Sequence, residues 1–67
     1  MPEIDLFKVC VNLVDDINEM TELMKQYDEN DSFVDYLEGS IATRESVVRQ
    51  LGYGEYLEKN VKERTYC

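Results

Sequence analysis

The chain has 67 residues, a formal net charge of −8, two cysteines and no histidine. A domain of this size buries only about 60% of the surface of its unfolded chain, so its core is small. The lack of histidine removes the commonest general base and metal ligand, and the acidic charge opposes binding to phosphates and anionic lipid. We therefore expect no catalytic residue, no cofactor and no metal site, and binding to nucleic acid is disfavoured.

The first predicted helix covers residues 4–27, where apolar residues recur at alternating intervals of four and three. This spacing is typical of a helix that buries one seam against another helix. The seam consists of Leu6, Cys10, Leu13, Ile17, Met20, Met24 and Tyr27. Cys10 is expected to act as a small buried apolar residue, and a disulfide to Cys67 is the less favoured alternative.

The N-terminal half of this helix is apolar around most of its circumference, because Phe7, Val11 and Val14 form a second row beside the seam. A helix that buries two faces needs more than one neighbour, and a short chain offers few. We therefore expect a homo-oligomer, a dimer or larger. Its predicted interface consists of Leu6, Phe7, Cys10, Val11 and Val14.

The side of the first helix away from the seam carries four acidic residues with little compensating charge. We call this set the acidic ridge: Asp15, Asp16, Glu19 and Glu22. Residues 1–35 hold ten acidic and two basic residues, so they carry the whole net charge of −8. Such a surface attracts basic protein surfaces, but it can also serve only to keep the protein dissolved.

Residues 28–31 form the clearest break in the helical pattern, because aspartate and asparagine favour turns. The acidic composition raises the question of a calcium-binding EF-hand loop. Counted from Asp28 as first ligand, Phe33 stands where that loop needs glycine, and Gly39 stands where it needs glutamate. We therefore predict a turn between two helices.

The second predicted helix covers residues 32–51, with Ser32 as its N-cap. Gly39 lies inside this helix, so a break over residues 39–42 is the alternative to one continuous helix. Gly52 is expected to end it. A short third helix is predicted over residues 55–64, where apolar residues line one face.

The sequence thus predicts an all-α fold in one small domain spanning residues 1–67. An antiparallel hairpin of residues 4–27 and 32–51 would pack with the short C-terminal helix of residues 55–64. The longest uncharged run in the first helix is residues 9–14, far below the ~20 residues that span a bilayer, and no segment resembles a signal peptide. We expect no membrane contact and a cytoplasmic location, inside a host cell if the protein belongs to a phage.

We interpret the chain as a non-enzymatic protein-binding module whose acidic ridge occupies a basic surface of a partner protein, as an inhibitor or antitoxin-like regulator would. Small phage and mobile-element proteins that block enzymes acting on nucleic acids have a similar composition. Two alternatives stay open. One is a DNA-binding regulator that uses residues 47–64, which resemble a helix-turn-helix although three glutamates offset their basic residues. The other is a structural or assembly oligomer.

Overall fold

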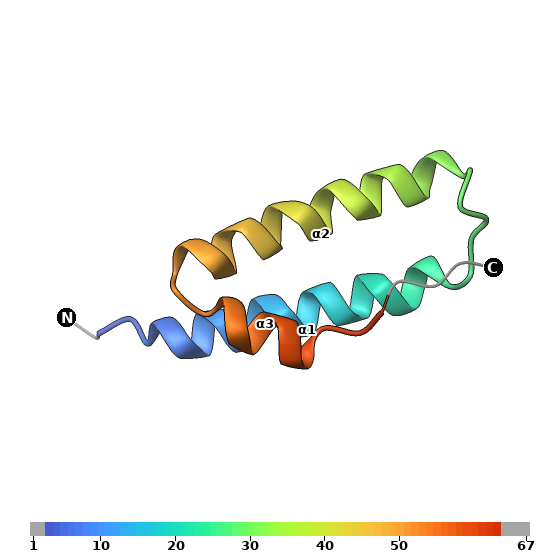
Figure 1. Ribbon diagram of the computed structural model, residues 1–67. Coiled ribbons are helices and arrows are strands. Elements are labelled where there is room, and N and C mark those ends of the chain that lie inside the picture. Colours follow the sequence, from blue (N-terminus) through green and yellow to red (C-terminus); the bar gives the residue numbers. More distant parts are fainter. Residues whose placement is uncertain (1–2, 64–67) are drawn as a thin grey trace.

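Figure 1 shows the computed structural model, which describes residues 3–63. The helices are α1 (Leu6–Met24), α2 (Ser32–Gln50) and α3 (Gly54–Asn60), and no strand occurs in this part of the chain. α1 and α2 run antiparallel, and α3 folds back toward α1. The predicted all-α hairpin with a short third helix is confirmed. None of the helices within residues 3–63 combines the length and apolar character that crossing a membrane requires.

The ends of the two long helices follow local capping signals. α1 begins after Asp5, whose side chain accepts a hydrogen bond from the Lys8 backbone N–H at 3.2 Å. α2 is capped by Asp31, one residue before the predicted Ser32, and Asp31 Oδ1 accepts from the Phe33 N–H at 2.9 Å. α1 stops at Met24 rather than near residue 27, because the next three backbone N–H groups bond three residues back and tighten the chain into a turn.

The second helix is continuous through Gly39, as the favoured prediction had it. It ends at Gln50, and Gly52 follows with φ +92°, a conformation that side chains with a Cβ rarely adopt. Gly52 therefore ends the helix, as predicted, because glycine can adopt the positive φ that this position requires.

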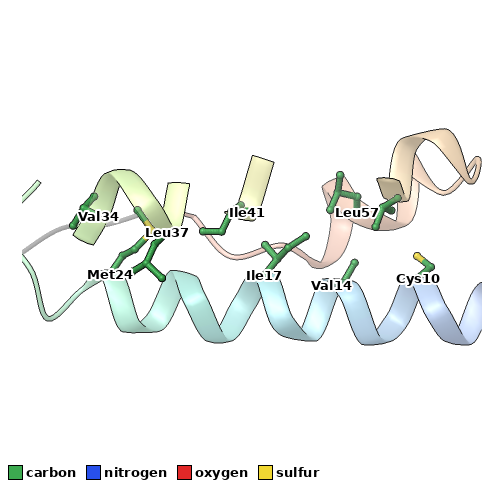
Figure 2. Packing of buried hydrophobic residues seen from close by; sticks show 9 residues of the cluster. Cys10, Val14, Ile17, Met24, Val34, Leu37, Ile41 and Leu57 are labelled. Carbon is green, nitrogen blue, oxygen red and sulfur yellow. The ribbon is translucent and has the colours of Figure 1, made fainter. Parts of the chain in front are cut away.

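The core lies between α1 and α2 and is closed at one end by α3 (Figure 2). Its buried apolar residues are Cys10, Val14, Ile17, Met24, Val34, Leu37, Ile41, Val48 and Leu57. We call the buried residues of α1 its buried line: Cys10, Val14, Ile17, Thr21 and Met24. The Thr21 hydroxyl donates a hydrogen bond to the Ile17 carbonyl at 2.8 Å, so it is not left unpaired in the core.

Of the predicted seam only Cys10, Ile17 and Met24 are buried, because Leu6 is 48% exposed and Tyr27 is only partly buried. Val14 and Thr21 are buried, whereas the predicted Leu13 and Met20 are only partly buried at the flank of the buried line. The difference arises from tertiary packing. Leu57 of α3 packs into the same core beside α1, so the side of α1 that carries Val14 is buried.

The third helix is shorter than the predicted 55–64, since α3 ends at Asn60 and Val61 is already extended. We call residues 61–63 the strap. The strap leaves the helical path because it is hydrogen-bonded to α1, a contact that local sequence does not reveal. The last residue of the prediction, Arg64, lies outside the described residues.

The two glycines Gly39 and Gly52 are expected to respond in opposite directions to alanine. Gly39→Ala should raise the free energy of unfolding by about 0.5–1 kcal/mol, because the site is helical and nothing lies within 4 Å of an added Cβ. Gly52→Ala should lower it by about 1–2 kcal/mol, because its φ is +92°. Urea unfolding followed by circular dichroism measures both. Shifts of the same sign would contradict the backbone explanation.

Candidate partner-binding surface

The four residues of the acidic ridge lie exposed on α1, on the side turned away from α2. The buried residues of α1 hold the opposite side of the helix in the core, so the helix backbone fixes where these carboxylates stand. An open depression beside the ridge is lined by Asp15, Asn18, Glu19, Glu22 and Lys62. Lys62 belongs to the strap, so this depression is formed by two segments far apart in the sequence.

Asn18 holds the strap against α1 through both ends of its side-chain amide. Its Nδ2 donates to the Asn60 carbonyl at 2.9 Å, and its Oδ1 accepts from the Lys62 backbone N–H at 2.9 Å. One side chain thus satisfies backbone groups on both sides of Val61. The sequence reasoning missed Asn18, although an asparagine inside a helix is itself a signal, because its side chain has poor intrinsic helix propensity.

Glu22 is the member of the ridge whose charge is compensated. Its Oε1 lies 3.0 Å from Lys62 Nζ and 3.1 Å from Lys25 Nζ. The hydrogen bond from Lys62, followed by that from Lys25, lowers the pKa of Glu22 below its ordinary value. The expectation of little compensating charge is therefore wrong at Glu22. By contrast, Asp15, Asp16 and Glu19 form no ion pair with any described residue.

The five residues predicted as an oligomer interface do not share one surface. Cys10 and Val14 are buried in the core of the chain itself and are not available to a second copy. Leu6 and Phe7 are 48% and 46% exposed, and Val11 is half-buried. Cys10 is a free thiol whose pKa is raised by burial, and Cys67 lies outside the described residues.

The second apolar row of α1 is covered in part by α3. The ring of Phe7 meets Tyr53 and Tyr56 edge-on, with centroid distances of 5.6 and 5.3 Å. Such pairs stabilise a contact beyond the area they bury. The neighbour that the wide apolar face requires is therefore supplied, on this side, by the chain itself.

The segment proposed as a DNA-binding alternative, residues 47–64, contains the end of α2, a three-residue connection and α3. α3 has seven residues, which is less than two full turns. Lys59 is the only basic residue within α3, and Lys62, which follows in the strap, is paired with Glu22.

Within residues 3–63, no three cysteine or acidic side chains are grouped so that they could hold a metal ion. Comparisons of the chain with protein-family models, with curated proteins and with solved structures find no match.

The attachment of the strap to α1 should depend on pH, because Glu22 is ion-paired and its pKa is lowered. The stability that its ion pairs contribute is fully present above the pKa of Glu22 in the unfolded chain. It is lost as the pH falls through the lower pKa of the folded state. We expect the pKa of the Glu22 carboxyl, measured in an NMR titration, to lie below the ordinary value of a glutamate, and the protection of the Lys62 amide against hydrogen exchange to fall over the same interval.

Two variants separate the effect of the Glu22 charge from the effect of the Asn18 hydrogen bonds. Glu22→Gln should remove the pH dependence and leave the Asn18 bonds, whereas Asn18→Ala should abolish protection of the Lys62 amide at every pH. A pKa of Glu22 that is not lowered from the ordinary value of a glutamate would contradict the assigned pairing.

Proposed function

We propose that this protein is a small non-enzymatic binding module whose acidic ridge occupies a basic surface of a partner protein. The observation that carries the proposal is the state of Asp15, Asp16 and Glu19, which are exposed on one rigid helix and have no ion pair among residues 3–63. Carboxylates in this state attract cations at long range and lose no internal partner on binding.

The scaffold supports such a role because the ridge is fixed before any partner arrives. Ile17 and Thr21 lie between the ridge positions along α1, Val14 directly precedes them, and all three are buried against the rest of the fold. The backbone beneath the ridge is thereby ordered in the free protein. Preorganised charges of this kind favour fast, salt-sensitive association and specificity for a complementary surface.

An acidic helix that covers a basic surface competes with other acidic ligands of that surface, including the phosphates of nucleic acid. An inhibitor or antitoxin-like regulator of a protein that handles nucleic acid fits this chemistry. We place such a regulator in the cytoplasm. An origin in a phage or mobile element is part of the same hypothesis and rests on likeness of composition.

The test neutralises two unpaired members of the ridge. Captures from a native lysate are compared for the wild-type chain, for Asp15→Asn/Glu19→Gln, and for the control Glu55→Gln/Glu58→Gln, which removes the same charge from exposed positions of α3. The expected partner is a basic protein that the control retains. With the purified partner, the ridge variant should associate at least about tenfold more slowly at low salt.

Two results would overturn the proposal. One is a partner that binds the ridge variant and the control equally well. The other is association with the wild-type chain whose rate does not depend on salt, because steering by exposed charges is screened by ions.

A further inference from the structure

α3 and the strap cover only one side of the hairpin. With 100° between successive helical residues, Phe7, Asn18 and Glu22 all lie on the same side of the buried line of α1. These three residues make the contacts to Tyr53 and Tyr56, to the strap backbone and to Lys62. Within residues 3–63 the third helix and the strap thus leave the other side of α1 uncovered.

That uncovered side of α1 is apolar. The same helical geometry places Leu6, Val9, Leu13 and Met20 along it. Leu6 and Val9 are 48% and 38% exposed, and Leu13 and Met20 are half-buried. Leu6, Leu13 and Met20, three residues that the predicted seam placed in the core, therefore form part of an apolar surface.

α2 extends this surface on the same side. Phe33 and Val47 are fourteen positions apart, which is close to four helical turns, so they share one side of α2. The ring contact between Tyr27 and Phe33, at a centroid distance of 5.0 Å, joins that side to the end of α1. Gly54 of α3 lies by Arg49, on the other side of α2.

We call this surface the open face. Its members are Leu6, Val9, Leu13 and Met20 of α1, and Phe33 and Val47 of α2. Phe33 and Val47 are 36% and 39% exposed.

The open face is close to neutral although the chain carries −8. By the same geometry, Asp16 borders it on α1 and Arg44 lies on it from α2, while Asp15 and Glu22 lie on the side of the strap. A second copy that docks on the open face therefore keeps Asp15, Glu19 and Glu22 of both acidic ridges away from the interface, and only Asp16 of each ridge lies at its border. An apolar face with balanced charges suits a two-fold pairing with itself.

The side of the hairpin that carries the open face is just large enough for a specific dimer interface. Helices of 19 residues are about 28 Å long, and two of them side by side are about 20 Å wide. One face then offers about 560 Å² per copy, and a pair buries about 1,100 Å², just above the ~1,000 Å² of a specific interface. The radius of gyration, 13.0 Å against the ~11 Å of a compact chain of this length, is that of an elongated monomer.

We propose that a second copy of the chain covers the open face, so that two hairpins pack as a four-helix bundle with α3 on the outside of each. This inference is tested independently of the partner-binding role, because Asp15 and Glu19, the two residues changed in the test of that role, stay on the outer surface. It also changes the interface expected from sequence, with which it shares only Leu6.

Sedimentation equilibrium of the full chain in a reducing buffer, up to about 500 µM, tests the proposal. The wild-type mass should rise reversibly with concentration from the 7.9 kDa of one chain to twice that value. Val47→Lys should raise the dissociation constant at least about 100-fold, because a lysine would be buried in the interface. The adjacent Ser46→Lys, which adds the same charge at an exposed position outside the open face, should change it less than about threefold.

Circular dichroism is the check that each variant folds. If Val47→Lys does not fold, Leu6→Lys replaces it as the open-face variant. A wild-type mass that stays at 7.9 kDa at every concentration would overturn the proposal. So would a mass above two chains, or equal weakening by Val47→Lys and Ser46→Lys. None of these measurements involves a basic partner, so their failure leaves the proposed function to its own test.

Discussion

Ile17→Ala is expected to lower the free energy of unfolding by about 2–5 kcal/mol, the range for removing a buried isoleucine and leaving a cavity. Ile17 is fully buried in the middle of α1 and rises toward α2 (Figure 2). A domain of 67 residues is stable by only about 3–10 kcal/mol, so the variant should lose a large part of its stability.

Urea unfolding followed by circular dichroism measures this loss as a lower midpoint at unchanged slope. The matched control is Ile4→Ala, which removes the same atoms from a side chain that is 77% exposed. Its effect should stay within about 0.5 kcal/mol. Equal losses in the two variants would mean that the α1–α2 seam is not the core.

Leu57→Ala is expected to lower the free energy of unfolding by about 2–3 kcal/mol and to release α3 and the strap. Leu57 is the one buried residue among the seven of α3. A helix of seven residues is not stable by itself in water, so α3 depends on this anchor. The hairpin of α1 and α2 should keep its helical content.

NMR separates the two effects of Leu57→Ala. The Phe7 ring shifts, which depend on Tyr53 and Tyr56, should move toward those of an exposed phenylalanine. The Lys62 amide should lose its protection against hydrogen exchange. Glu58→Ala, an exposed position of the same helix, is the control and should change neither. Protection of Lys62 that survives in Leu57→Ala would show that Asn18 holds the strap without α3.

The ends of α2 could be predicted because their signals are local. The Asp31–Ser32 pair and Gly52 place the ends of α2 within one residue of the predicted 32–51, since capping and positive φ act on the adjacent backbone. The continuity of α2 through Gly39 could also be predicted. The free-energy cost of one glycine in a helix is smaller than the stabilisation from the surrounding helical residues.

Which side of α1 is buried could be predicted only in part. The periodicity identifies Cys10, Ile17 and Met24 correctly, but Leu13 and Val14 are equally apolar neighbours. The choice between them depends on where α3 docks, and that is a property of the whole fold. The fold also buries Cys10 and Val14 of the predicted oligomer interface and leaves the opposite side of the hairpin open.

The acidic ridge shows the same division between sequence and structure. The sequence by itself determined that the charge of −8 belongs to residues 1–35 and that four acids share the outer side of the first helix. Only the tertiary structure decided which of them is neutralised, because Lys62 lies 40 positions from Glu22 in the chain. Asn18 brings these two residues together by bonding to the backbone of the strap. Contacts between such distant residues depend on the fold of the whole chain, so they cannot be predicted from helical periodicity.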